Sequence, residues 1–359
     1  MQADNAGAVA LSRTTGLVEI APEIDFSGQT VLVTGAADGI GAALASALCF
    51  FGAHVVALDV QREKLENLRL ELGDDCLSTI PFDLSETDPA VYMALADKIV
   101  SSSPSGKIDA YVMNAGVVKL LDIKKHNTVA NTPAVEFMKL AQINAHSHAE
   151  IYKTLRDHFA DNARIVVTSS PIVGRADPKT AAYSVTKGML ESYANNIAAE
   201  LKGTGLILTG YVPPPVQNFL RTDLKPKEPL YAHPHGLDIA ELPLRLAAPS
   251  VKVEFNGKVI AFGYENQGDR LRQKATLADG TGYDFMPRDP SDNGFIYDLR
   301  IRSIGQGGGD DGALFRANYS TDSLRRIMGL GRTPDMAVGQ AIDSVYRAPD
   351  HVRQFRPEP

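Results

Sequence analysis

Residues 30–50 read TVLVTGAADGIGAALASALCF: a short β-branched run, a glycine-rich turn and an apolar helical pattern. Directly after the glycines, Ile40, Leu44 and Leu48 recur at helical spacing. Glycines at such a turn let backbone N–H groups approach a pyrophosphate at the helix N-terminus, where the helix dipole favours anions. A tight strand-to-helix turn without a ligand would have the same sequence, so the interpretation depends on the residues that follow.

The alternation of strand and helix continues beyond this turn to about residue 209. The short apolar runs are 30–33, 54–58, 77–80, 108–112, 165–168 and 206–209. The helical windows between them are about 40–51, 62–72, 88–101, 134–160 and 181–202. Strands buried on both faces read as continuous apolar runs, as these do. We therefore predict an α/β fold, a doubly wound, Rossmann-like parallel sheet with helices on both faces and a ligand at the carboxyl ends of its strands.

Composition excludes several classes of protein. The 359 residues are 44% hydrophobic and 22% charged, which is typical of a globular chain. A net charge of −7 gives no general attraction to nucleic acid or to an anionic membrane, and we expect neither as a partner. Two cysteines exclude a disulfide scaffold, and His146 and His148 lack metal-ligand spacing, so no metal site is expected. Asp4 stands where a secretory signal would be basic, and we expect a soluble, cytoplasmic protein.

We expect three parts: an N-terminal leader at 1–26, a Rossmann-type catalytic domain at 27–263, and a C-terminal extension at 264–359 that packs on the core or on a partner subunit. Two segments compete as the last helix of the core. One is 237–248, followed by a strand at 258–262; the other is 334–347, with 219–330 as an insertion. We favour the first. Asn256-Gly257 between two apolar runs also predicts a hairpin of 251–255 with 258–262.

Acidic and amide side chains follow the early strands. Asp59 closes the second strand about 20 residues after the glycine turn, where a carboxylate can bind a ribose 2′-hydroxyl and repel a 2′-phosphate. NAD is therefore favoured over NADP, although the nearby Arg62 opposes this preference. Asp83 and Asn114 follow the third and fourth strands and should lie at the same edge. Alternatively, Asp83 caps a helix and Asn114 is a turn residue.

A second group of polar residues lies later in the chain. Tyr183 and Lys187 share one helical face with core residues. Ser170 ends the fifth strand, thirteen residues before Tyr183. Asn144 lies on the apolar face of its helix, and a buried amide needs specific hydrogen-bond partners. By itself the Tyr183-Lys187 pair could be a half-exposed phenol beside a snorkelling lysine.

Together these residues resemble the short-chain dehydrogenase/reductase family, in its shorter, single-domain branch. The resemblance covers about 27–218 and depends on Thr34-Gly35-x-x-x-Gly39-Ile40-Gly41, Asp83, Asn114-Ala115-Gly116, Asn144, Ser170, Tyr183-x-x-x-Lys187 and Pro213. It implies the catalytic residues Asn144, Ser170, Tyr183 and Lys187. The cofactor-binding residues it implies are Gly35, Asp38, Gly39, Ile40, Gly41, Asp59, Asp83, Leu84, Asn114, Ala115, Gly116, Tyr183, Lys187, Pro213 and Val216.

The resemblance also implies a mechanism. Tyr183 is the general base in oxidation and the acid in reduction, and Lys187 lowers its pKa and holds the nicotinamide ribose. Ser170 hydrogen-bonds the substrate oxygen, and Asn144 positions a water that relays protons to Lys187. The chain departs from the family after the sixth strand. It has Pro213-Pro214-Pro215 in place of Pro-Gly, which puts nicotinamide contacts at Val216 and Asn218 in doubt.

The function expected is an NAD(H)-dependent oxidoreductase that interconverts a secondary alcohol and a ketone. Two alternatives stay open: a non-catalytic dinucleotide-binding or assembly protein on the same fold, and a lyase or isomerase that uses NAD transiently. The intact set of four catalytic residues favours an enzyme. We expect a small-molecule substrate with an apolar body, because Leu220, Leu224 and Leu230 suggest an apolar pocket wall. We also expect a homodimer or homotetramer.

Overall fold

The computed structural model describes most of the chain up to residue 263 and separate segments beyond it. The described residues are 23–118, 128–173, 180–214, 236–263, 273–276, 282–285, 296–304, 313–320, Leu324 and Met328.

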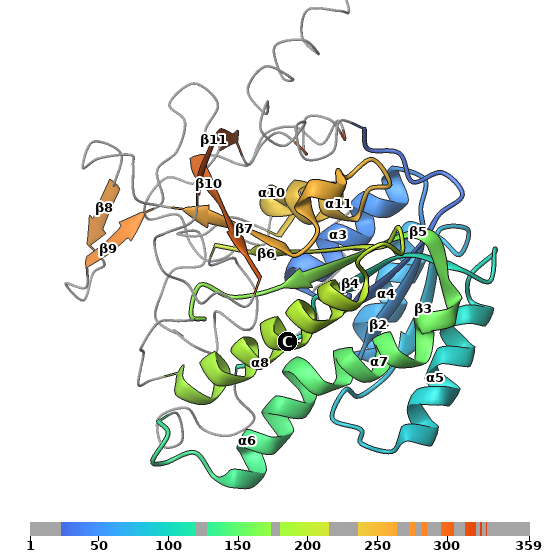
Figure 1. The fold of residues 1–359 in the computed structure, drawn as a ribbon, viewed down its shortest axis with the longest axis horizontal. Helices are drawn as coiled ribbons and strands as arrows, with labels where there is room; N and C mark the ends of the chain where they lie inside the picture. The colour runs from blue at the N-terminus through green and yellow to red at the C-terminus, as the bar shows by residue number, and fades with distance from the viewer. Residues whose placement is uncertain are drawn as a thin grey trace, which may run out of the picture.

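Seven parallel strands form the centre of the molecule (Figure 1). They are β1 (Thr30–Thr34), β2 (His54–Asp59), β3 (Leu77–Pro81), β4 (Ile108–Met113), β5 (Phe159–Thr168), β6 (Ile207–Val212) and β7 (Lys258–Gly263). Their spatial order is β7-β6-β5-β4-β1-β2-β3. The chain therefore builds outward in opposite directions from the β1–β4 neighbourhood, which is the point where ligands bind in doubly wound sheets. The predicted fold class is confirmed.

Helices cover both faces of the sheet (Figure 1). One face packs against α3 (Gly39–Phe50), α4 (Arg62–Leu72), α10 (Gly236–Ile239) and α11 (Glu241–Ala247). The other face packs against α5 (Pro89–Ser101), α7 (Ser147–Leu155) and α8 (Ala181–Glu200), with α6 (Ala134–Ala141) beside α8. The described residues also include three short helical turns: η1 (Gln142–His146), η2 (Arg156–His158) and η5 (Val253–Phe255).

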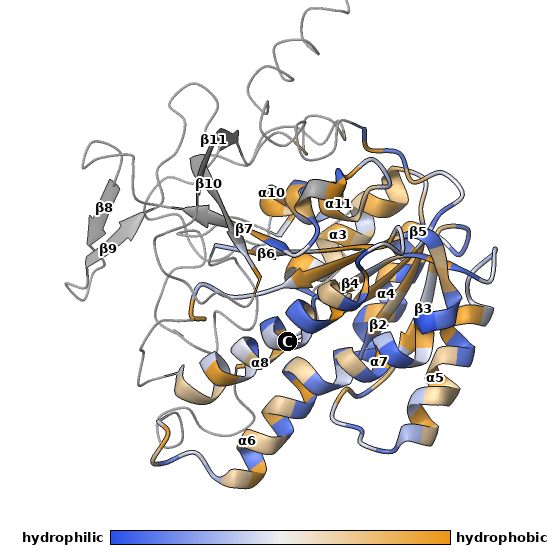
Figure 2. Ribbon diagram, in the orientation of Figure 1, coloured by the Kyte–Doolittle hydropathy of each residue, from blue (hydrophilic) through white to orange (hydrophobic). Residues whose placement is uncertain are grey.

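Each strand contributes side chains to two separate cores. Val31 and Val33 of β1 belong to the cluster beneath α3, whereas Leu32 belongs to the cluster beneath α5 and α8. This alternation explains why the strands read as continuous apolar runs, because neither face is exposed to water. Figure 2 shows the same arrangement, with largely hydrophobic strands and alternating hydrophilic and hydrophobic bands along α5, α7 and α8.

The structure corrects the predicted hairpin. Residues 253–255 form a short 3₁₀ turn, and β7 pairs parallel to β6. Asn256-Gly257 does form a turn, with Gly257 at φ 70°, but the turn precedes β7 and does not close a hairpin. It is hydrogen-bonded to the start of β6, where Leu208 N–H donates to Asn256 Oδ1 at 2.9 Å. The chain runs through α10 and α11 into β7, as in the order that we favoured. The competing helix at 334–347 lies outside the described residues.

Segments outside the predicted catalytic domain also contact it. β10 (Ile296–Ser303) pairs antiparallel with the outer edge of β7, and β11 (Ala313–Ser320) pairs antiparallel with β10. β8 (Gln273–Thr276) and β9 (Gly282–Phe285) form a separate two-stranded sheet. At the other end, Phe26 of the predicted leader is fully buried in the core, and its N–H donates to the Phe51 carbonyl at 3.0 Å.

Within the part of the chain that the structure describes, no helix is both long enough and apolar enough to cross a membrane.

The start of α10 lies against the glycine turn. A Cβ added to Gly236 would lie 2.4 Å from the Gly39 carbonyl oxygen. This oxygen belongs to the backbone, so it cannot move aside as the end of a flexible side chain could. We predict that Gly236→Ala lowers the free energy of unfolding by about 1–3 kcal/mol through overpacking. Urea unfolding followed by circular dichroism measures it.

Gly188→Ala is the matched control for this substitution. Gly188 lies inside α8, where an added Cβ meets nothing within 4 Å. Because alanine is the better helix former, this variant should be as stable as the wild type or more stable. Equal unfolding free energies for the two variants would contradict the close contact at Gly236.

Candidate active site

The glycine turn is folded tightly onto the strand ends beside it. Gly35 and Gly39 have φ angles of 66° and 55°, which favour glycine. A Cβ on Gly41 would lie 2.0 Å from the Gly35 carbonyl oxygen, and one on Gly35 would lie 2.9 Å from the Cα of Ala115. Asp38 begins α3 as its N-cap and accepts a hydrogen bond from Gly39 N–H at 2.8 Å. The turn therefore presents the N-terminal end of α3 where β1 and β4 end, as a pyrophosphate site requires.

Asn114 links the ends of β1 and β4. Its Nδ2 donates to the Thr34 carbonyl at 3.0 Å and to the Gly35 carbonyl at 3.3 Å. In return, the Thr34 hydroxyl accepts hydrogen bonds from the N–H groups of Asn114 at 3.0 Å and Ala115 at 3.2 Å. Asn114 is thus more than a turn residue, because its side chain holds the glycine turn in place.

Asp59 lies at the end of β2 and is buried against the same turn. Its Oδ2 accepts from Ala37 N–H at 3.0 Å, and its Oδ1 accepts from Gln61 N–H at 2.9 Å. Asp38 contributes a second carboxylate nearby, 3.7 Å from the Lys64 ammonium. The part of the candidate site beside β2 and the start of α3 therefore contains two carboxylates, and Lys64 partly balances the charge of Asp38.

The remaining predicted cofactor residues differ in how they are placed. Asp83 is exposed and accepts from Ser85 N–H at 2.8 Å, while Leu84 is buried beneath it. Pro213 is half-buried just beyond the end of β6. Val216 and Asn218 lie outside the described residues.

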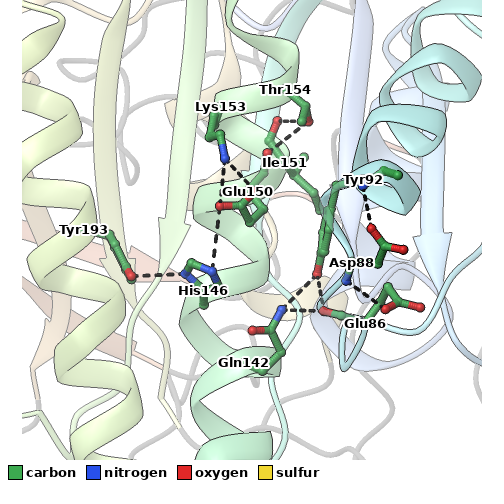
Figure 3. Close-up of polar contacts among 11 residues, drawn as sticks. Glu86, Asp88, Tyr92, Gln142, His146, Glu150, Ile151, Lys153, Thr154 and Tyr193 are labelled. Atoms are coloured by element: carbon green, nitrogen blue, oxygen red, sulfur yellow. Dashed lines mark hydrogen bonds and ion pairs between the residues drawn. The ribbon is translucent and has the colours of Figure 1, made fainter.

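A single π-helical turn, η1, interrupts the helix pattern read at 134–160 and holds Asn144. Contacts on two sides fix this turn (Figure 3). Gln142 Nε2 donates to the Glu86 carbonyl at 2.5 Å and to the Tyr92 hydroxyl at 3.2 Å, toward α5. His146 Nδ1 lies 3.2 Å from the Tyr193 hydroxyl of α8. Such bulges often occur at functional sites because they redirect a side chain.

Asn144, between these two anchors, is fully buried. Its Oδ1 accepts from Val117 N–H at 2.7 Å, and its Nδ2 donates to the Val117 carbonyl at 2.7 Å and to the Thr186 hydroxyl at 3.0 Å. The buried amide thus has the specific partners that its apolar surroundings demand. It connects the segment after β4 to the turn of α8 that carries Lys187.

Ser170, Tyr183 and Lys187 come together at the end of β5 and the start of α8. The Ser170 hydroxyl is hydrogen-bonded to Tyr183. Lys187 is 2% exposed, and its Nζ donates to the Thr168 carbonyl at 3.0 Å. A Cβ on Gly116 would lie 3.0 Å from Lys187 Nζ and 3.4 Å from Asn144 Oδ1, so Gly116 leaves room for both groups.

The electrostatics of this cluster differ from the expectation. Burial raises the pKa of Tyr183 to about 12, and the hydrogen bond with Ser170 opposes that rise only in part. Burial lowers the pKa of Lys187 to about 8, against the opposing charge of Glu191. The expected lowering of the tyrosine pKa by Lys187 is not seen: loss of hydration at the Tyr183 hydroxyl dominates, and only the hydrogen bond with Ser170 opposes it.

Three buried residues of the site were missed by the sequence reading. Thr186 accepts the Asn144 hydrogen bond, and Ser169 donates to Glu191. Their positions in the sequence could have indicated them. Thr186 directly precedes Lys187, and Glu191 follows Lys187 by one helical turn on the same face of the helix. Among the described residues, no group of three or more His, Cys, Asp and Glu side chains is placed to hold a metal ion.

Comparison with known proteins agrees with this geometry. A family model described as short chain dehydrogenase matches residues 29–229, more than half of the chain. The chain belongs to the short-chain dehydrogenase family of dinucleotide-binding oxidoreductases, which confirms the resemblance noted in the sequence.

Relatives extend the match over different lengths. The oxidoreductase UcpA of Escherichia coli K12 is 27% identical over 71% of this chain and 94% of its own length. D-threitol dehydrogenase of Mycolicibacterium smegmatis is 40% identical, but the match covers only 28% of this chain and 39% of that enzyme.

Solved structures show the same fold. A short chain dehydrogenase of Pseudomonas syringae superposes with a TM-score of 0.61 at 26% identity, covering 67% of this chain and 96% of that one. A 3-ketoacyl-(acyl-carrier-protein) reductase of Brucella melitensis, complexed with NADH, superposes with a TM-score of 0.55 at 26% identity. The match covers 63% of this chain and 93% of that one.

A buried histidine supports the Asn114–Gly116 segment from below. His148 Nε2 lies 3.1 Å from the Ala115 carbonyl and Nδ1 3.1 Å from the Tyr111 hydroxyl. Since a carbonyl can only accept, Nε2 carries the proton and Nδ1 accepts from Tyr111. Burial is the main reason that the pKa of His148 falls from 6.5 to about 4, so the ring is neutral at pH 7.

This lowered pKa predicts a pH-dependent stability. The contribution of neutral His148 is complete above pH 6.5, and it is lost as the pH falls from 6.5 toward 4, where the unfolded chain binds the extra proton. The loss should be about 3 kcal/mol at most. His148→Gln keeps a donor and an acceptor but cannot titrate. Urea unfolding between pH 7.5 and 4.5 should show a shallower decline for the variant; parallel declines would contradict the assignment.

Proposed function

We propose that this protein is an NAD(H)-dependent oxidoreductase that interconverts a secondary alcohol and a ketone, with Tyr183 as general acid and base. The observation that carries the proposal is the hydrogen bond between Ser170 and Tyr183 beside the buried Lys187, at the strand ends next to the glycine turn. These groups meet where a doubly wound sheet binds its ligand.

The residues present fit a nicotinamide dinucleotide. Gly35, Gly41 and Gly116 lack Cβ atoms where backbone or catalytic side chains approach closely, so the glycine turn, Ala115 and Lys187 can pack together at the β1–β4 boundary. The N-terminal end of α3 would bind the pyrophosphate, Asp59 the adenosine ribose and Lys187 the nicotinamide ribose. When bound, the nicotinamide would supply the hydride acceptor in oxidation or the donor in reduction.

The side chains would handle the proton and the substrate oxygen. With a pKa of about 12, Tyr183 is protonated at neutral pH and is ready to donate to a carbonyl oxygen in reduction. Ser170 would donate a hydrogen bond to the same oxygen and stabilise its developing charge. In oxidation, the hydrogen bond with Ser170, which lowers the Tyr183 pKa against the effect of burial, would favour the phenolate. Asn144, held between Val117 and Thr186, would position a water that relays protons to Lys187.

The preference for NAD is proposed from charge. Asp59 is buried at the end of β2, and Asp38 lies at the start of α3, so a 2′-phosphate would meet two carboxylates. Lys64 and Arg62 act in the opposite direction. The solved relatives include complexes with NADH and with NADP, so the fold itself accommodates either cofactor.

The substrate class and assembly are proposed from the surroundings. Relatives are named as a D-threitol dehydrogenase and a 3-oxoacyl-[acyl-carrier-protein] reductase, names that refer to an alcohol and a ketone. We propose a small substrate with an apolar body. Exposed Val135 and Met138 on α6 and Val185 on α8 support a homodimer or homotetramer, because such side chains are commonly covered by a partner.

We predict that Tyr183→Phe reduces turnover at least about a thousandfold, within the range of general acid–base effects combined with loss of the substrate hydrogen bond. NADH affinity, measured by fluorescence titration, should stay within a few-fold, because the ring and its packing are kept. Turnover above a tenth of the wild type would contradict the assignment of the acid and base.

Tyr152→Phe provides the matched control. It removes a phenol hydroxyl from α7, where the Tyr152 ring stacks on Phe159 at the start of β5, the opposite end of that strand from Ser170. Turnover of this variant should remain near that of the wild type.

We predict that Asp59→Ser lowers the ratio of NAD to NADP affinity by about tenfold or more, because removing a carboxylate near a 2′-phosphate is worth roughly 1.4 kcal/mol or more. Calorimetric titration of both cofactors measures the ratio. Asp97→Ser, at an exposed position of α5, makes the same change in net charge and should leave the ratio unchanged. Wild-type protein that binds NADP as tightly as NAD would overturn the argument from charge.

A further inference from the structure

Three successive turns of α8 contact three consecutive residues at the end of β5. Tyr183 is hydrogen-bonded to Ser170, Lys187 to the Thr168 carbonyl, and Glu191 to Ser169. The three helix residues are spaced four apart, so they share one face of α8. The first two contacts belong to the candidate catalytic machinery, whereas nothing in the proposed reaction uses the third.

The third contact is as deeply buried as the other two. Glu191 is 1% exposed and Ser169 is 2% exposed. The Ser169 hydroxyl donates to Glu191 Oε1, and the Ser169 N–H donates to the Tyr211 carbonyl at 2.9 Å. Burying a carboxylate is costly unless it is paired and hydrogen-bonded. A glutamate at position 191 therefore indicates a role for its charge or its hydrogen bond, since an apolar side chain such as leucine would pack there at lower cost.

Glu191 also acts on Lys187, one helical turn away. Burial lowers the pKa of Lys187, and the charge of Glu191 opposes that effect. Among the described residues, the Thr168 carbonyl of β5 accepts from the ammonium, and His148 of α7, which also interacts with Lys187, is uncharged at neutral pH with a pKa of about 4. The Asn144 amide from η1 lies close to the same ammonium.

We propose that Glu191 is a positioning residue of the active site. Through Ser169 it fixes the end of β5 that carries Ser170, and its carboxylate keeps Lys187 charged and bonded to the Thr168 carbonyl. The inference rests on the proposed function, since it concerns the alignment of Ser170, Tyr183 and Lys187 for proton transfer.

Two substitutions separate the hydrogen bond from the charge. Glu191→Gln keeps an oxygen that can accept from Ser169 and removes the charge. Ser169→Ala removes the hydrogen bond and keeps the charge. Glu200→Gln, exposed at the end of the same helix, is the charge-matched control.

The first readout is the titration of Lys187, followed by NMR of protein labelled with ¹³C in the lysine side chains and assigned with Lys187→Arg. It needs neither cofactor nor turnover. We expect the Lys187 pKa near 8 in wild type and in Glu200→Gln, and a lower value in Glu191→Gln. An unchanged Lys187 titration in Glu191→Gln would overturn the electrostatic role. Should that variant fail to fold, Glu191→Asp, which moves the charge back by one methylene, should shift the titration in the same direction.

The second readout is the pH profile of kcat. In Glu191→Gln, the profile should move to lower pH with Lys187, because the ammonium is lost earlier. In Ser169→Ala, we expect kcat to fall several-fold with KM little changed and with the Lys187 titration kept. If Ser169→Ala retains wild-type kcat, or both variants lose activity equally at every pH, the residues are merely structural and the proposal is wrong.

The two readouts keep this inference apart from the proposed function. Wild-type protein that neither binds a nicotinamide dinucleotide nor reduces ketones would contradict the proposed function, yet a Lys187 titration that depends on Glu191 would still support the electrostatic coupling. An active wild type with variants that titrate and turn over normally would overturn the inference alone.

Discussion

The close approach of two backbone segments, at the point where β1 and β4 diverge, governs the rest of the site. The chain leaves these neighbouring strands in opposite directions, and Asn114 fills the space between their ends by donating to the carbonyls of Thr34 and Gly35. Space for that contact exists only because Gly41 presents no side chain, since a Cβ there would lie 2.0 Å from the Gly35 carbonyl oxygen. The start of α3, the position of Ala115 and the clearance at Gly116 all follow from this packing.

A second constraint acts on the polar groups enclosed by α7, α8 and β5. Asn144, Lys187 and Glu191 are almost fully buried, in a region where an unpartnered polar group would be costly. Each is bound to a backbone or side-chain partner, and the π-turn that carries Asn144 is anchored through Gln142 and His146. Because these bonds exist in the protein without a ligand, little reorganisation would be needed if charge developed on a substrate oxygen as in the proposed reaction.

The features that the sequence could predict are those determined by local chemistry. The parallel sheet and glycine turn follow from continuous apolar runs and from glycines placed directly before a helix, and the resemblance named Asn144, Ser170, Tyr183 and Lys187. The predicted hairpin was wrong because Asn256-Gly257 favours a turn both within a hairpin and before a parallel strand. The hydrogen bond with Leu208, which is distant in sequence, distinguishes the two cases. The π-turn was read as plain helix because the apolar spacing continues through it. The pKa values depend on burial, which no local pattern contains.

The strands beyond β7 show how the chain can grow without disturbing this site. β10 and β11 join the sheet beyond β7, and β7, β6 and β5 separate them from the β1–β4 boundary. The family match ends at residue 229, and the match to UcpA covers 94% of that protein but 71% of this chain. The addition also pairs the edge of β7, which would otherwise present unpaired backbone groups. These strands therefore extend the sheet at the edge away from the β1–β4 boundary and leave the contacts of Asn114 and Lys187 unchanged.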